Sequence, residues 1–375
     1  MSDRQAADER RTRACEFGIR TGIFAPGRWN AVTDVAGVLV GHLTVVEGTD
    51  VRTGATAVVP HAGNLLTDRV PAGLAVANGH GKLMGATQIV ELGEIETPIV
   101  LTNTLSVPQA AEAILDWTLA RDENREAVSI NPVVGETNDG TLNAIHRRTL
   151  TAAQIRRAID EANDGPVAGG CVGAGTGTTA FGWKAGIGTS SRRLPRGLGG
   201  FTVGVLVQAN FAGVLQILGV PIGRLLRRHH LADAVDDGAQ HGSIMIIVAT
   251  DAPLLDRNLT RLARRSFAGL ARTGASFANG SGDYAIAFST AESVRSTPER
   301  RGGVTAVGEL GNDAVSGLFQ AVIEATEEAI YDALFLAEAM TGRNGTTVDA
   351  LPLDRVVPIL RERDALEPGP PGNTA

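Results

Sequence analysis

The sequence predicts a layered α/β or α+β fold, in which helices cover a mixed sheet or a pair of sheets. Short apolar runs rich in β-branched residues, bounded by Gly, Pro or Asn, are typical of buried strands. Amphipathic segments at helical spacing lie between groups of these runs, so the strands cluster rather than alternate one to one with helices. No repeat of about 20–50 residues and no linker interrupts the chain. We therefore expect residues 1–375 to form a single domain.

The predicted strands are short and mostly apolar. Several alternate poorly between polar and apolar residues, which indicates burial on both faces. Turn-forming residues at both ends separate them from the rest of the chain. Examples are the segments 37–46, 55–61, 73–81, 97–102, 200–210, 243–250 and 283–290.

The predicted helices are identified by their first residues and their apolar faces. Pro108 fits the first turn of one helix, and Thr151 fits the cap of the next, with Ile155, Ala158 and Ile159 inward. A third helix repeats apolar residues from Leu259 to Leu270 with arginines mostly outside them.

The longest helix is expected to begin near Asn312 or Asp313 and to run to about Met340, with Gly342 as its stop. A stripe of apolar residues at helical spacing predicts which side of it is buried. The stripe includes Leu318, Val322, Ala325, Ala329 and Ala333.

Composition excludes several classes of function. The net charge is −7 and aromatic residues are 4% of the chain, which gives neither the basic face nor the stacking residues of a nucleic-acid-binding protein. The two cysteines, Cys15 and Cys171, lie far apart and form neither a metal-binding spacing nor a disulfide framework. The charged N-terminus lacks the apolar core of a signal peptide, and no apolar run reaches the ~18 residues of a membrane span. We expect a cytoplasmic protein without a membrane or nucleic-acid partner and without a metal.

The glycine-rich segment 169–191 raises the question of phosphate binding. It departs from the phosphate-loop pattern, because Gly182 is followed by Trp183 and Lys184 rather than by Gly-Lys-Ser/Thr. It also lacks the strand–turn–helix context of a dinucleotide-binding motif. We interpret it as a tight turn whose backbone lies close to another strand. The adjacent His229 and His230 belong to a basic run and are read as a solvated surface rather than a metal site.

The junction of Gly242 and Ser243 has two interpretations. A polar run ends at Gly242, and Ser243 begins a near-continuous apolar strand. The simpler interpretation is a loop that enters a strand. The alternative is that the chain is cut there, which would leave Ser243 with a free α-amine. Such an amine has a pKa of about 7.7–8 and can act as the base for the serine hydroxyl, for which no Ser-His-Asp motif is present.

Three further segments place polar groups at strand ends or turns. Ser281 and Asp283 stand two apart at a strand entrance and should face the same side. Asn210 ends a buried strand, where its amide could face a reacting carbonyl. A turn after an apolar pair is expected to present Glu136, Asn138 and Asp139. Turn and strand-end chemistry favours the same residue types without any catalytic role.

Taken together, these segments resemble the family of self-processing aminopeptidases that includes the L-aminopeptidase/D-alanyl esterase-amidase and the β-peptidyl aminopeptidases. The likeness spans roughly residues 30–290, and it is specific as a set although no single piece is. The matching stretches are NAVTDVAGVLVGH, GATAVVPH, NGHGKLMGATQI, TPIVLTNTLSV, PVVGETNDGTLN, GAGTGTTAFGWKAGIGTSSR, GVLVQANFAG, GSIMIIVATDAPL and NGSGDYAIAFST.

The resemblance implies a four-layer α-β-β-α sandwich like that of the N-terminal-nucleophile hydrolases, with its own strand connectivity. It implies self-cleavage after Gly242 into chains 1–242 and 243–375, and a homo-tetramer of such pairs. Ser243 matches the nucleophile, and Ser281 and Asp283 match the pair that tunes it. The oxyanion-hole amide is matched by Asn210.

In the same resemblance Glu136 matches an acid that receives the ammonium of the substrate. Some members have Glu where this chain has Asp283, and some have an aromatic residue where Asn138 stands in this chain, so substrate preference is left open. The implied reaction is release of the first residue of a peptide, amide or ester with a free amine through an acyl-enzyme, without a cofactor. The alternatives are acyl transfer of the ornithine acetyltransferase type and a non-enzymatic ligand-binding protein that uses the glycine-rich loop.

Overall fold

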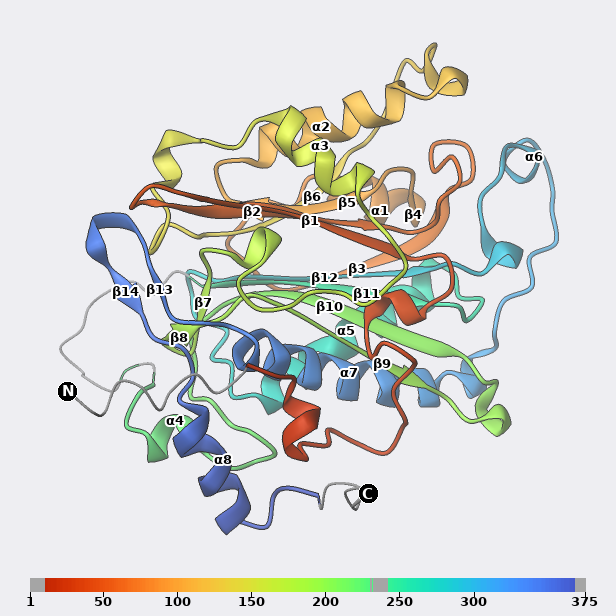
Figure 1. The fold of residues 1–375 in the computed structure, drawn as a ribbon. Helices are drawn as coiled ribbons and strands as arrows, with labels where there is room; N and C mark the ends of the chain where they lie inside the picture. The colour runs from red at the N-terminus through yellow and green to blue at the C-terminus, as the bar shows by residue number, and fades with distance from the viewer. Residues whose placement is uncertain (1–10, 230, 232–241, 368–375) are drawn as a thin grey trace, which may run out of the picture.

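The computed structural model describes residues 11–229, 231 and 242–367. Figure 1 shows two sheets stacked face to face, with α2 and α3 covering the outer face of one and α5 and α7 covering the outer face of the other. This is the four-layer α-β-β-α arrangement that the resemblance implies. The predicted cut before Ser243 lies at the edge of the described residues, because 232–241 lie outside them.

The first sheet has four strands in the order β1-β2-β5-β6. β1 pairs with β2 and β2 with β5 in antiparallel fashion, whereas β5 and β6 are parallel. Its strands are β1 (Leu39–Glu47), β2 (Val51–Val59), β5 (Ile99–Asn103) and β6 (Val133–Thr137).

The second sheet has six strands in the order β4-β3-β12-β11-β10-β9. Its two central strands, β11 and β12, are parallel, and every other pair is antiparallel. The strands are β3 (Val70–Gly79), β4 (Glu94–Ile95), β9 (Ile187–Arg193), β10 (Thr202–Asn210), β11 (Ser243–Thr250) and β12 (Gly282–Ser289).

The helices and two small hairpins complete the described chain. Pro108 lies in the first turn of α2, and Thr151 caps α3 through a hydrogen bond from the Gln154 N–H, as the sequence predicts. The helices are α1 (Ala86–Leu92), α2 (Val107–Leu119), α3 (Ala152–Asp160), α4 (Ile222–Leu225), α5 (Asp256–Arg272), α6 (Pro298–Arg301), α7 (Ser316–Phe335) and α8 (Leu353–Glu362). The hairpins pair β7 (Thr179–Ala180) with β8 (Trp183–Lys184) and β13 (Met340–Thr341) with β14 (Thr347–Val348).

Three apolar cores separate the four layers. One lies between α2, α3 and the first sheet, one between the sheets, and one between the second sheet and α5 and α7. Along β11, Met245 and Ile247 face the core between the sheets, whereas Ile244 and Ile246 face the helices. Burial on both faces explains why this strand is a continuous apolar run.

The glycine-rich segment packs its backbone against neighbouring backbone, which confirms the tight-turn interpretation. A Cβ on Gly175 would lie 2.4 Å from the Ile187 nitrogen, and one on Gly186 would lie 1.8 Å from the Gly170 carbonyl oxygen. A Cβ on Gly54, in the first sheet, would meet the Gly173 carbonyl oxygen at 2.4 Å. Only glycine allows approaches of this kind.

Two predictions about element boundaries are wrong. The longest helix is preceded by a separate 3₁₀ turn at Asn312–Ala314, and it ends at Phe335 rather than near Met340, which lies in β13. Beyond Phe335 the backbone has other partners, because Cys171 Sγ lies 3.4 Å from the Glu338 nitrogen as a hydrogen-bond acceptor. The predicted inward stripe of this helix is fully buried.

The second correction concerns Glu136, which lies within β6 and not in a turn. The apolar pair before it extends into a strand because β6 pairs in parallel with β5, where Glu136 stands opposite Thr102. The turn begins only after Thr137. Glu136 is therefore held by the first sheet, while Ser243 is held by the second.

Candidate active site

Ser243 is the first residue of β11, at the end of a central strand of the second sheet. It stands opposite Asn210 on β10 and beside Gly282 on β12. Its side chain shares a face with Met245, which packs in the core between the two sheets. The residue is 5% exposed. Pairing on both sides gives this serine a fixed position.

The hydroxyl of Ser243 lies directly beside the peptide bond that would be cut. Ser243 Oγ donates a hydrogen bond to the carbonyl oxygen of Gly242 at 2.5 Å. The backbone N–H of Gly282 points at the same place, 3.2 Å from the Gly242 carbonyl oxygen and 3.2 Å from Ser243 Oγ. A backbone donor aimed at a carbonyl oxygen stabilises the negative charge that develops there when the carbon is attacked.

Gly242 has little room for a side chain. A Cβ at this position would lie 3.0 Å from the Cα of Phe211 and 3.4 Å from the carbonyl oxygen of Asn210. Gly242 is thus packed closely against the end of β10. Close packing accounts for a glycine at this position.

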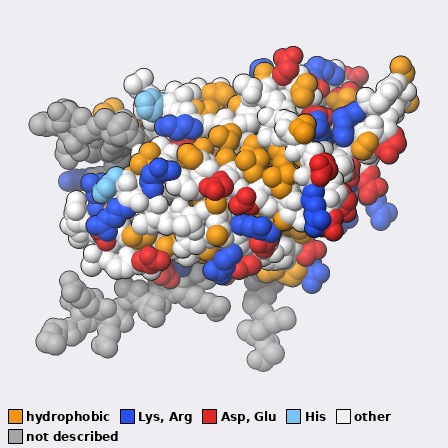
Figure 2. All heavy atoms as spheres, turned by 90° about the horizontal axis from the view of Figure 1, so that it is seen from above, with side chains coloured by type: hydrophobic (Ala, Val, Ile, Leu, Met, Phe, Trp, Pro, Cys, Tyr) orange, Lys and Arg blue, Asp and Glu red, His pale blue; other side chains and the backbone are white. Residues whose placement is uncertain are grey.

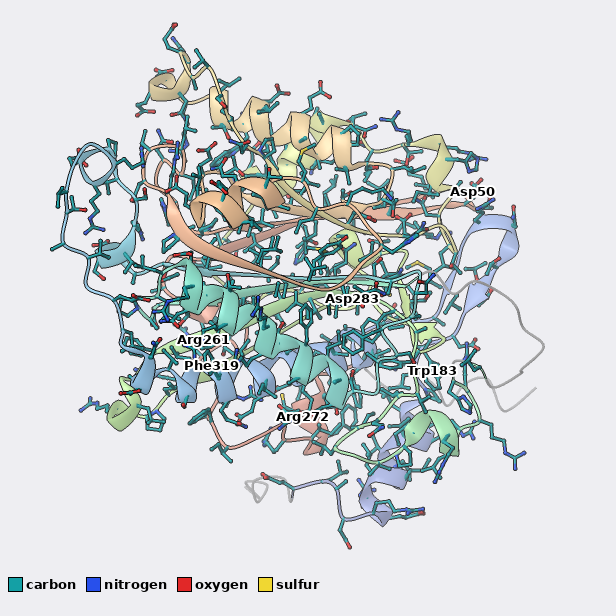
Figure 3. All side chains as sticks on the ribbon, turned by 180° about the vertical axis from the view of Figure 1, so that it is seen from behind. Asp50, Trp183, Arg261, Arg272, Asp283 and Phe319 are labelled. Carbon is teal, nitrogen blue, oxygen red and sulfur yellow. The ribbon has the colours of Figure 1, made fainter. Side chains whose placement is uncertain are left out.

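Ser281 and Asp283 face the same side, as the sequence predicts. Ser281 Oγ donates to Asp283 Oδ1 at 2.5 Å, and both residues are 2% exposed. Burial raises the pKa of the Asp283 carboxyl, and the bond from Ser281 partly offsets this. The second oxygen, Oδ2, has no hydrogen-bond partner among the described residues. Figure 3 shows Asp283 at the level of the sheet, above α5 with its labelled Arg261 and Arg272.

The Ser281–Asp283 pair approaches the nucleophile from the other side of the sheet. Asp283 pairs with Ile244, whose side chain packs in the core under α5 and α7, while Ser243 faces the first sheet. Within the described part of the chain, no hydrogen bond joins the Ser281 or Asp283 side chain to Ser243. The pair is placed toward the backbone side of Ser243 rather than toward its hydroxyl.

Asn210 has one end of its amide fixed. Its Oδ1 accepts a hydrogen bond from the Thr179 N–H at 3.0 Å, so the NH₂ group points away from that partner. The residue lies opposite Ser243, and neighbours of the same parity on β10, such as Leu206, face the space between the sheets. Asn210 therefore has a donor on the same face as the nucleophile, which fits an oxyanion-hole role.

Glu136 reaches the site from the first sheet. It is 3% exposed, and its two oxygens accept one hydrogen bond each, from the Lys82 N–H at 2.9 Å and from the Thr104 hydroxyl. Each carboxylate oxygen has a further lone pair. Gly81 and Tyr284 are the neighbours on the side of the second sheet: a Cβ on Gly81 would lie 3.2 Å from Glu136 Oε1.

Asn138 and Asp139 stabilise the turn that follows β6. Asn138 is partly exposed, and its Oδ1 accepts from the Gly140 N–H at 2.8 Å. Asp139 is buried and accepts from Thr53 Oγ1 at 2.6 Å and from Asn143 Nδ2 at 2.9 Å. Burial raises the pKa of Asp139 to about 7. Asn and Asp side chains commonly accept hydrogen bonds of this kind in turns.

Sequence reasoning missed the contributions of Gly282, Lys82, Thr104 and Tyr284. The first two act through backbone N–H groups, which every residue except proline has, so no residue type signals them. Thr104 follows the predicted strand 97–102, and Tyr284 lies within the predicted strand 283–290; neither has a local pattern that indicates a functional role. The available signal for Tyr284 is that it directly follows Asp283, a residue of the family motif.

The described residues contain no candidate metal cluster and no membrane-spanning helix. No group of three or more His, Cys, Asp and Glu in 11–229, 231 and 242–367 could hold a metal ion. Nor is any helix there long and apolar enough to cross a membrane.

On the face seen in Figure 2, acidic and basic side chains are interspersed around a central group of hydrophobic ones. Of the two adjacent histidines, His230 lies outside the described residues.

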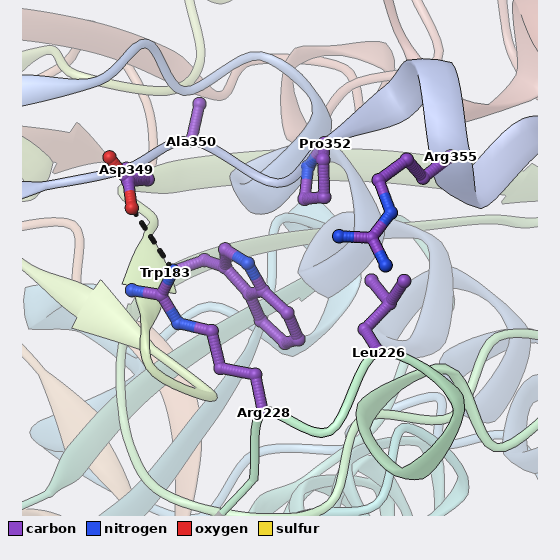
Figure 4. Close-up of a pocket in the computed structure, with 7 residues that line it drawn as sticks. All are labelled: Trp183, Leu226, Arg228, Asp349, Ala350, Pro352 and Arg355. Carbon is purple, nitrogen blue, oxygen red and sulfur yellow. Dashed lines mark hydrogen bonds and ion pairs between the residues drawn. The ribbon is translucent and has the colours of Figure 1, made fainter.

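A cavity of about 240 Å³ lies beside the β7–β8 hairpin and is lined in part by Trp183 of β8 (Figure 4). The Arg228 guanidinium lies over the Trp183 ring, 5.4 Å from its centre, and pairs with Asp349 at 3.2 Å. Arg355 points into the cavity opposite this pair. The same hairpin carries the Thr179 N–H that donates to Asn210 Oδ1.

The two stacked sheets between helical layers, with a buried serine that begins a central strand, fit a serine hydrolase with an Ntn-hydrolase-like fold. The sequence model of peptidase family S58 matches residues 30–348. The chain belongs to peptidase family S58 and is a serine aminopeptidase. This assignment removes the non-enzymatic ligand-binding alternative.

Known relatives match over nearly their whole length. The chain is 40% identical over 358 residues to the beta-peptidyl aminopeptidase BapA of Sphingosinicella microcystinivorans, covering 90% of this chain and 89% of the relative. The structure of a Burkholderia sp. beta-aminopeptidase matches with a TM-score of 0.84 and 40% identity, covering 96% of this chain and 100% of that chain.

The L-aminopeptidase D-Ala-esterase/amidase of Ochrobactrum anthropi matches with a TM-score of 0.86 and 35% identity, over 95% of this chain and 99% of that one. It is described as a prototype for the serine aminopeptidases and a new variant among the Ntn hydrolase fold. These matches confirm the family and the sandwich fold expected from the sequence.

Proposed function

We propose that this chain is a precursor that cuts itself between Gly242 and Ser243, and that the new N-terminal serine releases the first residue of peptides, amides or esters through an acyl-enzyme. The observation that carries the proposal is the contact of Ser243 Oγ with the Gly242 carbonyl, under the N–H of Gly282. A serine hydroxyl that lies beside its own preceding carbonyl needs little movement to attack it.

Self-cleavage proceeds by an acyl shift from nitrogen to oxygen. Ser243 Oγ bonds to the carbonyl carbon of Gly242, and the Gly282 N–H stabilises the oxyanion. The bond from that carbon to the Ser243 nitrogen breaks, and the hydroxyl proton passes to the nitrogen. Water then hydrolyses the Gly242 ester. The products are chain 1–242, which ends in a carboxylate, and chain 243–375, which begins with a free amine.

The same serine acts on substrates once its amine is free. The amine takes the hydroxyl proton as Oγ attacks the substrate carbonyl, and it returns the proton to the leaving group. The buried Ser281–Asp283 pair approaches Ser243 from its backbone side, where the amine forms, and is suited to orient it. The Asn210 amide stabilises the oxyanion on the opposite side, and such a donor typically lowers the barrier by ~3–4 kcal/mol.

Glu136 makes the enzyme an exopeptidase in this proposal. Its buried carboxylate binds the ammonium of the first residue through a charge-assisted hydrogen bond. Substrates whose amine is blocked would leave that carboxylate without a counter-ion. By likeness to the beta-peptidyl aminopeptidases named above, we extend the substrate class to β-aminoacyl compounds. The homo-tetramer of processed chain pairs, which the family resemblance implies, stays a prediction.

The test compares a free-amine aminoacyl p-nitroanilide with its N-acetylated form, using wild-type enzyme and Ser243→Ala. Wild type should hydrolyse only the free-amine compound, and Ser243→Ala should hydrolyse neither. Equal rates on the two compounds would contradict the aminopeptidase mechanism. Transfer of the aminoacyl group to an added amine instead of water would favour the acyltransferase alternative.

A further inference from the structure

Tyr284 lies at the boundary between the two sheets, close to both the nucleophile and the proposed amine anchor. It is the third residue of β12 and is 6% exposed. A β-bulge precedes it: Asp283 pairs with Asn78 on β3, whereas Tyr284 pairs with Val76. Bulges re-aim side chains and are frequent beside active sites. The direction of the Tyr284 side chain is therefore set by this bulge in β12.

The environment of two glycines shows where the ring lies. A Cβ on Gly282 would stand 3.0 Å from Tyr284 Cε2, and a Cβ on Gly81 would stand 3.0 Å from the same atom. The N–H of Gly282 donates to Ser243 Oγ at 3.2 Å. The ring edge thus lies against the glycine that contacts the nucleophile and, at the same time, against Gly81.

Gly81 lies beside the acid as well. The point where its Cβ would stand is 3.2 Å from Glu136 Oε1 and 3.4 Å from the Tyr284 hydroxyl. Both oxygens therefore border one small space that a side chain on Gly81 would fill. The charges of Glu136 and Asp283, after burial, raise the pKa of the Tyr284 hydroxyl. The hydroxyl stays protonated and neutral at pH 7, and its oxygen can accept a hydrogen bond.

We propose that Tyr284 is a positioning and specificity-determining residue, whose hydroxyl joins Glu136 in binding the substrate ammonium and whose ring, with Gly81, limits the length of the substrate between its amine and its scissile carbonyl. This inference rests on the proposed function. A substrate with its ammonium at Glu136 and its carbonyl at Ser243 extends past the ring edge. An α-aminoacyl group has one carbon in that stretch, and a β-aminoacyl group has two.

The structure gives two variants that change this space in opposite directions. Tyr284→Leu keeps apolar contacts in the core between the sheets but removes the outer ring, which enlarges the space. Gly81→Ala adds a methyl group between the ring and the carboxylate, which narrows it. The backbone of Gly81 lies outside the left-handed region, so its conformation suits alanine, and the ring edge of Tyr284, 3.0 Å from the added Cβ, has to shift by only a few tenths of an ångström.

The experiment measures kcat/KM for an α-alanyl and a β-alanyl p-nitroanilide with protein whose processing has been confirmed. One methylene in a shaped pocket typically changes selectivity by about tenfold or more. Tyr284→Leu should shift the ratio about tenfold toward the β-alanyl compound, and Gly81→Ala should shift it toward the α-alanyl compound. A ratio that stays within twofold of wild type in both variants would overturn the proposal.

Tyr284→Phe isolates the hydroxyl. Loss of one hydrogen bond to the ammonium should raise KM about three- to tenfold with little change in kcat. An unchanged KM would remove the hydroxyl from ammonium binding. The matched control is Tyr331→Phe, the same substitution at the other tyrosine, which is buried between Glu327 and the Leu218 N–H. That variant should lower Tm without altering KM or the ratio.

Failure of the proposed function gives a different result. If wild-type enzyme hydrolyses neither free-amine compound, the aminopeptidase mechanism is wrong, and the assignment of Tyr284 falls with it. If wild type hydrolyses them and the variants keep its selectivity and KM, only the assignment of Tyr284 is wrong.

Discussion

Replacing Glu136 by glutamine removes a charge and keeps the shape of the side chain. The carboxylate is 3% exposed and accepts from the Lys82 N–H and from the Thr104 hydroxyl. The glutamine oxygen can keep the bond from Lys82, while its NH₂ donates to Thr104, whose hydroxyl can turn to accept. Both local contacts are therefore retained, and the fold should be little affected.

The effect on catalysis follows from the lost ion pair. A hydrogen bond to a charged group in a buried site is worth about 1.5–3 kcal/mol, which corresponds to about a 10- to 150-fold loss of kcat/KM for free-amine substrates. The ammonium is bound in both the ground state and the transition state, so most of the loss should appear as a higher KM. Self-cleavage should be intact, because the scissile bond of the precursor carries no free amine.

The assay is steady-state hydrolysis of an aminoacyl p-nitroanilide, with processing confirmed on a denaturing gel. A desamino analogue of the same substrate is the control. It leaves the wild-type carboxylate without a counter-ion, whereas the glutamine variant has no charge to pair, so the variant should hydrolyse this analogue at least as well as wild type does. A Glu136→Gln enzyme whose kcat/KM for the free-amine compound stays within threefold of wild type would refute the role of this acid.

Three further predictions concern the oxyanion donor, a buried acid and a close backbone contact. Asn210→Ala should lower kcat about 100-fold or more with a smaller change in KM, because its contact strengthens as charge develops; steady-state kinetics on processed protein that show an unchanged kcat would exclude it. The raised pKa of Asp139, about 7, means that the folded state holds a proton that the unfolded state has lost above its pKa near 4. Stability should therefore fall by up to about 1.4 kcal/mol per pH unit from pH 4 to 7, and denaturant titrations of Asp139→Asn should lack this slope. A Cβ on Gly188 would lie 1.8 Å from the Ala329 carbonyl oxygen, so Gly188→Ala should destabilise the protein by about 2 kcal/mol or more, which a lower Tm would reveal and an unchanged Tm would contradict.

The segments that the sequence predicts well are those whose local pattern agrees with their burial. The apolar run 243–250 is β11 as predicted, and the apolar face of the longest helix is buried throughout. Strand β9 was missed because Ile187–Arg193 is mostly polar. Its Arg192 is buried through ion pairs with Glu324 and Glu328 of α7, which are more than 130 residues away in sequence, so no local pattern indicates it.

The same distinction holds for the candidate site: local sequence patterns indicate some of its residues, and contacts between distant segments bring in the others. Ser243 and the Ser281–Asp283 pair could be found from strand entrances, because each lies at the start of a strand. Glu136 belongs to the other sheet, and only the family resemblance connected it with Ser243. The Gly282 N–H could not be predicted at all, since its role depends on the parallel pairing of β11 with β12.

The mass and N-terminal sequence of the purified protein test the central claim most directly. In proportion to its 375 residues and 39.0 kDa, cleavage after Gly242 should give chains of about 25 and 14 kDa, and the smaller chain should begin Ser-Ile-Met-Ile. Ser243→Ala should remain one full-length chain under the same conditions. Wild-type protein that stays a single 39.0 kDa chain after prolonged incubation, or a smaller chain that begins at another residue, would contradict the account.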